Sequence, residues 1–468
     1  MTNIFTNPDL FIIINEYTDI RSLCDTCKSF LILKKYINYK LNKKYSLMYY
    51  NDILFRNIVL NKIFNPLKQL HLKLSCCDYI TDVSVLCNIH TLDLSSCVNL
   101  IDVSVLKNIH TLKLRSCRNI TDVSQLGNVH TLDLSFCKNI TDVGALGNVH
   151  TLNLSYCENI TDVSALGNVY DLDLSCNFIN INGFSKITDV SALGSVHTLK
   201  LSGCKNIKDV SALGSVHTLK LSGCNNIKDV SALGKVYDLD LRYCENITDV
   251  SALGSIHTLS LSGCNNIKDV SLLGNVHTLH LSHSNITDVS ALGNVYNLDL
   301  SHSNITDVSA LGNVYNLDLS HCDKIINVST LGNVNTLYLH HCNNITDVSI
   351  LGKVHTLDLS HSNITDVSAL GNVHTLDLSY CDNITDVSAL GNVHTLDLSY
   401  CDNITDVSAL GNVHTLDLKY CKNITDVSAL GNVHTLDLSD CENITDVSAL
   451  GNVYRLDCNG CNTKDVSH

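Results

Sequence analysis

The chain has 468 residues, with only 2 Pro, no Trp and 22 Cys, and its formal net charge is −15. Residues 1–70 carry ten Lys or Arg against five Asp or Glu, so the net charge of the remainder is −20. This acidic remainder repels phosphate, which argues against nucleic-acid binding and favours a basic protein partner. The first apolar run is only five residues long and lacks a basic leader, so we expect neither a signal peptide nor a membrane segment.

The first 50 residues follow a helical pattern rather than the pattern of the rest of the chain. Apolar residues recur at spacings that fit short amphipathic helices, namely Leu10, Ile13, Ile14, Tyr17, Leu23, Cys27, Phe30 and Leu33. We therefore expect a small helical domain over residues 1–50, and a helical linker or N-terminal cap over residues 51–70.

This head resembles an F-box, the helical module that docks on the Skp adaptor of SCF-type ubiquitin ligases. The resemblance rests on the order Pro8, Ile13, Ile14, Tyr17, Asp19, Leu23, Cys27-Lys28 and Phe30. The chain departs from the family at Asn7, where Leu is usual, and at Phe30, where Trp is common. The resemblance implies that the adaptor contacts Pro8, Leu10, Ile13, Ile14, Tyr17, Leu23, Cys27 and Phe30. The alternative is that the head only caps the repeats that follow.

From residue 71 to the C-terminus the chain is a short tandem repeat. The segment NVHTLDLSYCDNITDVSALG occurs twice in direct succession between residues 372 and 411, and related segments begin near residue 88. A fixed period this short predicts a solenoid in which every repeat is one coil stacked on the last. We count about 20 coils of 19–20 residues. A coil of this length leaves no room for a long helix, so we expect short 3₁₀ or extended segments on its return path.

Each coil contains one short strand. In residues 131–135 polar and apolar residues alternate, which predicts that Leu132 and Leu134 face the core while Thr131, Asp133 and Ser135 face outward. Parallel strands of successive coils would lie ~4.8 Å apart.

The frame V-x-x-L-x-L-x-x-C-x-x-I resembles the leucine-rich repeat. The resemblance implies an α/β solenoid, an arc with a parallel β-sheet on its concave face, preceded by the small helical domain. The phrase C-x-N-I-T-D resembles the cysteine-containing repeats of F-box proteins, whereas three shorter repeats with Ser284, Ser303 and Ser362 follow another spacing. The phrase NITDVSALGNV also resembles bacterial internalin repeats. Repeats this uniform behind an F-box-like head resemble giant-virus or amoebal proteins.

One repeat carries an insertion. Between Cys176 and Ile187 the chain is seven residues longer than in the other repeats, and we expect a loop near residues 177–186. Its Phe178 and Phe184 either fold back on the solenoid or contact a partner.

The cysteines and the N-I-T sequons indicate the compartment. Most cysteines recur once per repeat at one position, which predicts a buried packing column. N-I-T sequons recur in the same way, and glycans on adjacent coils would collide. We therefore expect reduced thiols and a cytoplasmic protein, in the host cytoplasm if the chain is viral.

A histidine precedes the strand in many repeats, as His130 and His374 do. Stacked imidazoles could attract a metal, but no repeat supplies a closed ligand set, so we expect neither a metal site nor a cofactor. Protonation of the column near pH 6 should weaken coil stacking.

The outward position between the paired leucines is the candidate partner-binding surface. It is mostly Asp in the last repeats, at Asp358, Asp377, Asp397, Asp417 and Asp437. This run is either an acidic stripe for a basic partner or a product of recent duplication. Departures from the repeat pattern are further candidate contacts, namely Lys113, Arg115, Lys200, Lys220, Tyr338 and His340.

No phosphate-binding loop, nucleophile elbow or zinc-protease motif occurs, so we do not expect an enzyme. The sequence favours a protein–protein interaction protein, a substrate-recognition subunit of an SCF-type ubiquitin ligase. The first alternative is a binding scaffold or decoy with no link to ubiquitin. An internalin-like secreted adhesin is a third hypothesis, disfavoured by the missing signal peptide.

Overall fold

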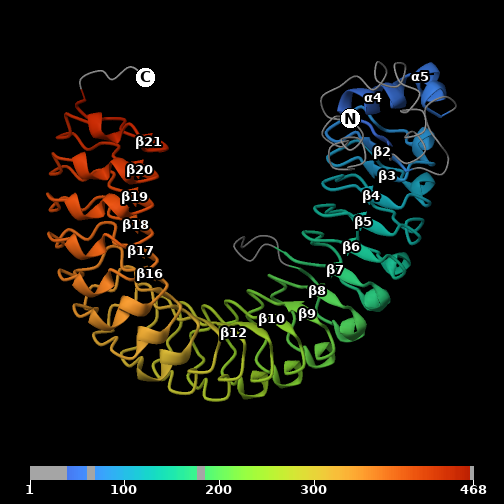
Figure 1. Cartoon of the computed structure of the whole chain (residues 1–468). Helices are drawn as coiled ribbons and strands as arrows, with labels where there is room; N and C mark the ends of the chain where they lie inside the picture. Colours follow the sequence, from blue (N-terminus) through green and yellow to red (C-terminus); the bar gives the residue numbers. More distant parts are fainter. Residues whose placement is uncertain (1–38, 61–68, 177–184, 464–468) are drawn as a thin grey trace, which may run out of the picture. The chain divides into compact units, whose positions relative to one another are not determined.

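The computed structural model describes residues 39–60, 69–176 and 185–463, and it forms two compact units, residues 1–173 and residues 174–468. Both units are built from the same stacked coil (Figure 1). The eight F-box-like positions from Pro8 to Phe30 lie outside the described residues, as do Phe178 and Phe184 of the insertion.

In the first unit, the described residues form two short α-helices, seven strands and four 3₁₀ helices. The helices are α4 (Lys43–Asn51), α5 (Ile53–Ile58), η2 (Ser84–Leu86), η3 (Ser104–Leu106), η4 (Gly144–Leu146) and η5 (Ser164–Asn168). The strands are β1 (Tyr39–Lys40), β2 (Leu70–Lys73), β3 (Thr91–Asp93), β4 (Thr111–Lys113), β5 (Thr131–Asp133), β6 (Thr151–Asn153) and β7 (Asp171–Asp173).

In the second unit, the described residues form fourteen strands and twelve 3₁₀ helices. The strands are β8 (Thr198–Lys200), β9 (Thr218–Lys220), β10 (Asp238–Asp240), β11 (Thr258–Ser260), β12 (Thr278–His280), β13 (Asn297–Asp299), β14 (Asn316–Asp318), β15 (Thr336–Tyr338), β16 (Thr356–Asp358), β17 (Thr375–Asp377), β18 (Thr395–Asp397), β19 (Thr415–Asp417), β20 (Thr435–Asp437) and β21 (Arg455–Asp457). The 3₁₀ helices are η6 (Ser191–Ser195), η7 (Ser211–Leu213), η8 (Ser231–Leu233), η9 (Ser251–Leu253), η10 (Ser309–Asn313), η11 (Leu331–Asn333), η12 (Ser349–Lys353), η13 (Ser368–Leu370), η14 (Ser388–Leu390), η15 (Ser408–Asn412), η16 (Ser428–Asn432) and η17 (Ser448–Leu450).

Within each unit, every strand pairs in parallel and in register with the strand of the next coil. In β18 and β19, for example, Leu396 lies opposite Leu416 and Asp397 lies opposite Asp417. Within residues 174–463, Figure 1 shows the strands on the inner side of the stack and the 3₁₀ helices on the outer side. The predicted fold class, a parallel-sheet solenoid preceded by a small helical region, is confirmed, as are the short 3₁₀ segments.

The core is a set of apolar columns that run from coil to coil. In the coil of β18, Leu396, Leu398, Cys401, Ile404 and Val407 are all at most 1% exposed. A single coil has no interior, so these side chains become buried only between the coils on either side. One predicted orientation is wrong. Ser135 is buried rather than outward, and its hydroxyl donates to Asp133 Oδ1 at 2.6 Å.

The recurring polar residues make bonds between coils or within turns. Asn403 donates from Nδ2 to the backbone carbonyl of Asp382 at 2.6 Å, one coil earlier. Asp406 Oδ1 accepts from the backbone N–H of Ser408 at 2.9 Å, which closes the turn before η15. The Asn side chain of the N-I-T sequon therefore has a structural role, since the atom that a glycan would occupy already donates to the neighbouring coil.

The cysteine column is a packing column, as predicted. All twenty cysteines within the described ranges are free thiols, and most are buried. Cys421 Sγ donates to the carbonyl of Leu398 at 3.1 Å, one coil earlier. Burial raises the pKa of Cys381 and of Cys421 to about 12, so these thiols stay protonated and unreactive near neutral pH.

Helix α4 packs on β2, the first strand of the repeats. Its Ser46 hydroxyl accepts from the Lys73 N–H at 2.9 Å and donates to the Leu41 carbonyl at 3.1 Å. Tyr49 of the same helix is 2% exposed. Strand β1, which the sequence pattern did not predict, pairs with β2 in parallel. Both α4 and β1 thus contact the first strand of the repeats.

The glycine of the recurring S-A-L-G phrase is required by close packing between coils. Gly431 lies within η16, in a conformation that other residues can adopt, but a Cβ there would lie 2.6 Å from the carbonyl oxygen of Ala449 in the next coil. At Gly451, the equivalent residue one coil later, nothing lies within 4 Å of the added Cβ.

We predict that Gly431→Ala lowers the free energy of unfolding by about 1–3 kcal/mol, because the methyl group forces the two coils apart. Gly451→Ala, in the same sequence context, should leave it unchanged or raise it slightly. Urea unfolding of both variants measures the difference, and equal stabilities would contradict the packing argument.

Candidate functional site

The strand face of the second unit carries a continuous row of carboxylates. Asp358, Asp377, Asp397, Asp417 and Asp437 lie opposite one another on strands β16 to β20, one residue per strand. We call these five residues the acidic row. The register confirms that the candidates identified from the sequence as an Asp column are direct neighbours in space.

The acidic row is electrostatically strained. Each carboxylate is half-buried, and each Oδ1 accepts from the backbone N–H two residues later, as at Ser379 (2.9 Å) and Ser399 (2.8 Å). Burial, with repulsion from Asp397 and other row members, raises the pKa of Asp377 and raises that of Asp417 to about 6. Among the described residues, no Lys, Arg or His forms an ion pair with the row. A cationic ligand would therefore relieve both the burial cost and the mutual repulsion.

A first aromatic column, the strand-entry ladder, lies beside the row at the residue before each strand. In the second unit its stacked ring centroids are 4.5–4.9 Å apart. In this unit the ladder consists of His197, His217, Tyr237, His257, His277, Tyr296 and Tyr315, and then of His355, His374, His394, His414, His434 and Tyr454. The first unit has a shorter ladder of the same kind, which includes His130. Desolvation, followed by repulsion from neighbouring imidazoles, lowers the pKa of His130 and of His394.

A second aromatic column, the strand-exit ladder, lies on the other side of the row. It consists of His283, His302, His321, His341, His361, Tyr380, Tyr400 and Tyr420, with centroids 4.1–4.5 Å apart. All eight residues have a left-handed backbone, with φ from 54° to 61°. This conformation is unfavourable for side chains with a Cβ, and ring stacking offsets part of the cost. Gly203, Gly223 and Gly263 occupy the equivalent position in other coils. Recurring glycine at this position is a sequence signal for the left-handed backbone, which we did not predict.

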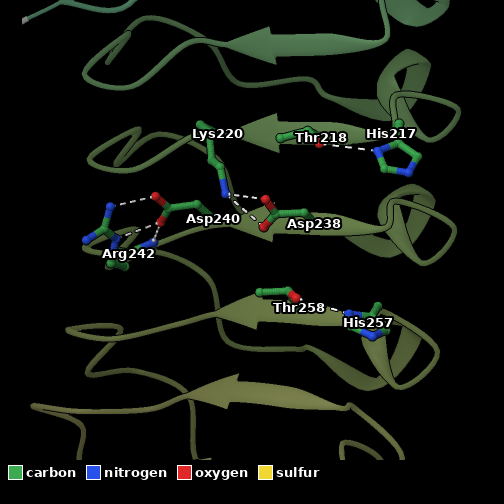
Figure 2. Close-up of polar contacts among 8 residues, drawn as sticks. All are labelled: His217, Thr218, Lys220, Asp238, Asp240, Arg242, His257 and Thr258. Atoms are coloured by element: carbon green, nitrogen blue, oxygen red, sulfur yellow. Dashed lines mark hydrogen bonds and ion pairs between the residues drawn. The ribbon is translucent and has the colours of Figure 1, made fainter. Parts of the chain in front are cut away.

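The predicted basic contacts are partly neutralised within the protein itself. Lys200 and Lys220 lie opposite each other on β8 and β9. Lys220 Nζ donates to both carboxylate oxygens of Asp238 at 2.8 and 2.7 Å, and Arg242 pairs with Asp240 at 2.8 Å (Figure 2). The ion pair between Lys220 and Asp238 therefore links the coils of β9 and β10.

In the first unit, Lys113 and Arg115 are exposed on and just after β4. The Arg115 guanidinium lies 4.7 Å from the ring centroid of Phe136, in cation–π geometry. These two cations are alternate residues of one strand face, but Arg115 is also engaged with a ring.

Tyr338 and His340 lie together in one coil, as expected. Tyr338 takes the place of an aspartate between Asp318 and Asp358, and it is 40% exposed. The ring of His340 lies 4.4 Å from that of His321 and 4.9 Å from that of His341. The sequence did not predict the contribution of His321, which comes from the preceding coil.

We predict that the strand-entry ladder makes the protein less stable in mild acid. The folded-state pKa of His130 and His394 lies below the unfolded value of 6.5, so the unfolded chain takes up protons first as the pH falls. This contribution to stability is complete above pH 6.5 and is lost as the pH falls through the lowered pKa. Asp417 acts in the opposite sense, since its pKa is raised and its contribution is lost as the pH rises through about 6.

The melting temperature should therefore fall between about pH 8 and about pH 5.5, and the fall should be smaller in the double variant His130→Tyr/His394→Tyr. Tyr occurs naturally in the ladder, at Tyr237 for example, so the variant keeps the stacking. A wild-type melting temperature that stays flat over this range would contradict the prediction.

Comparisons with known proteins agree with this architecture. Residues 128–147, 372–391 and 392–411 match the Leucine Rich repeat family model, and no curated protein sequence matches the chain. In the part of the chain that the structure describes, we find no helix with the length and apolar character needed to cross a membrane.

Among solved structures, TLR13 in complex with ssRNA13 is 18% identical, with a TM-score of 0.54 over 84% of this chain and 65% of that one. InlJ from Listeria monocytogenes, whose functional domain includes a cysteine ladder, is 20% identical, with a TM-score of 0.41 over 76% of this chain and 70% of that one. An LRR protein of Leptospira interrogans is 19% identical, with a TM-score of 0.40 over 87% and 93%. The three matched segments are leucine-rich repeats, and the other described coils share their geometry.

Proposed function

We propose that this protein is a non-catalytic binding protein whose strand face holds a basic segment of a partner protein along the acidic row. The observation that carries the proposal is the in-register row of five half-buried carboxylates from Asp358 to Asp437. The net charge of −20 beyond residue 70 supports the same sign of partner over longer distances.

The chemistry of the row and its flanks suits cations. A Lys or Arg side chain placed on the row would counter the burial and the repulsion from Asp397 and Asp437 that raise the pKa of Asp417. The aromatic ladders on both sides of the row present ring systems, of which Tyr380 is 42% exposed. The faces of these rings are stacked on one another, so their edges are left to pack against the aliphatic stems of Lys and Arg. The strand face thus supports both charge recognition and apolar contact.

The proposal includes no catalytic step. Most Ser, His and Asp residues of the described strand face belong to columns that recur from coil to coil. Solenoid repeats present extended surfaces that are used for binding, and the columns described above fit that role.

We predict that the full chain binds a lysine-rich peptide, and that Asp377→Asn/Asp397→Asn/Asp417→Asn weakens this binding. Three partly exposed ion pairs contribute at most about 1 kcal/mol each, so their loss corresponds to about tenfold to hundredfold weaker binding. Fluorescence anisotropy at several salt concentrations measures the affinity, which should fall as salt rises.

The matched control is Asp382→Asn/Asp402→Asn/Glu442→Gln, which removes the same charge from turns beyond the strands. If this control weakens binding as much as the row variant, only net charge matters and the row is not the site.

We further infer that the protein recruits its partner to an SCF-type ubiquitin ligase as a cytoplasmic substrate-recognition subunit. The support is the F-box-like order of Pro8, Ile13, Tyr17, Leu23 and Phe30 ahead of repeats that suit a binding surface. The sequon asparagines, which bond between coils, and the free thiols support a cytoplasmic location. The alternatives remain a scaffold or decoy without ubiquitin-ligase coupling, and a secreted adhesin.

We predict that the full chain captures the Skp-type adaptor in a pull-down, and that Pro8→Ala or Leu23→Ala abolishes capture. The control is Asp397→Asn, which lies on the strand face and should leave capture unchanged. Absence of capture by the wild-type chain would favour the scaffold or decoy.

A further inference from the structure

Three histidines of the strand-exit region converge in the second unit. One ring nitrogen from each of His321, His340 and His341 lies within 4.8 Å of the other two, and each side chain is partly buried. His321 belongs to the coil of β14, whereas His340 and His341 belong to the coil of β15. The cluster therefore spans two adjacent coils.

The convergence results from one departure from the repeat. At the position of His340, the coils on either side carry Ser320 and Ser360. The strand-exit ladder by itself stacks His321 and His341 nearly parallel, with an interplanar angle of 24°. His340 adds an imidazole at 82° to the ring of His321. Among the described residues, these three histidines are the one group of three or more His, Cys, Asp or Glu side chains whose donor atoms come this close together.

We propose that His321, His340 and His341 form a binding site for a divalent transition-metal ion of the zinc class. Imidazole nitrogens suit Zn²⁺, Cu²⁺, Ni²⁺ and Co²⁺, and three protein ligands leave one coordination position open. The ligands need to move onto the ion, because Zn–N bonds are ~2.0–2.1 Å long. Side-chain rotation supplies this movement for partly buried rings.

The backbone already holds the two coils in place around the site. The His321 N–H donates to the His340 carbonyl at 2.9 Å, which joins the coils of β14 and β15, and the His341 N–H donates to the Ser360 carbonyl of the next coil at 3.0 Å. Burial and the neighbouring imidazoles lower the pKa of His321 and His341, which favours the neutral, metal-binding form. A bound ion would join the coils of β14 and β15, and so it stabilises the stack as well as occupying the site.

The experiment uses the full chain, reduced and stripped of metal, titrated with Co²⁺ by visible absorption and with Zn²⁺ by calorimetry. The wild-type chain should bind one equivalent more tightly than all others. His340→Ser introduces the residue of the neighbouring coils, so it preserves the fold and should weaken this equivalent by at least about tenfold, since even outer-shell changes have effects of that size. His321→Tyr, which places a ring found elsewhere in the ladder, should do the same.

Two control variants keep the trio and remove other stacked imidazoles. His361→Tyr changes the next member of the strand-exit ladder, and His394→Tyr changes the strand-entry ladder. Both should retain the tight equivalent. If His340→Ser binds Zn²⁺ as tightly as the wild type, or if all four variants lose affinity alike, the ion binds along the histidine columns in general and the proposal is overturned.

A thermal readout separates this site from metal bound to thiols elsewhere. Zn²⁺ that binds the folded chain raises its melting temperature. The rise should be present in the wild type and in His361→Tyr but absent in His340→Ser, whose metal-free melting temperature should match that of the wild type. An equal rise in His340→Ser would overturn the proposal.

Discussion

The structure depends on one constraint, which is that no coil can bury its own apolar side chains. A coil of 19 or 20 residues closes around a single layer of Leu, Ile, Val and Cys, and that layer is sealed only by the layers above and below it. The side-chain hydrogen bonds also connect neighbouring coils. The Asn403 amide and the Cys421 thiol each donate to a backbone carbonyl of the preceding coil. At the first coil, helix α4 packs on β2, and its Tyr49 is 2% exposed. The regular core leaves the polar positions of the strand face free to differ between coils.

The surface combines features that are individually unfavourable. The acidic row places like charges on adjacent strands, and the strand-exit ladder places ring-bearing residues in a left-handed conformation. Both arrangements persist because the core and the in-register backbone hold them in place. Sites of this kind are suited to ligands, since a bound cation or a packed partner side chain removes a cost that the folded protein already carries.

Much of the fold could be predicted from the sequence, because the repeat length and the spacing of apolar residues within each repeat determine the stacked coils and their core. The 20-residue repeat indicates the solenoid, and the L-x-L alternation indicates which leucines are buried. The alternation failed at Ser135, which lies just after the strand and is buried because the chain no longer follows the in–out pattern of the strand there. The left-handed position was missed although glycine at Gly203 and Gly223 indicated it.

The candidate site was less accessible from sequence. The acidic row follows from register, and its members were identified correctly as a column. The pairing of Lys220 with Asp238 depends on side-chain conformation across two strands, and the contact of His321 with His340 joins residues 19 positions apart. Periodicity describes what coils share, whereas these contacts arise where one coil differs from the next. The F-box-like positions lie outside the described residues, so the role of the head stays a prediction.

The bonds between coils have a consequence for how such a chain can change in length. Because the Asn and Cys side chains bond to the coil immediately before their own, a duplicated or deleted unit meets the same neighbours as the unit it joins or replaces. Each added unit of the kind seen at residues 392–411 extends the acidic row by one carboxylate and each ladder by one ring. Under the proposed function, copy number would set binding strength in graded steps, and unequal recombination could change it without altering the contacts of the core.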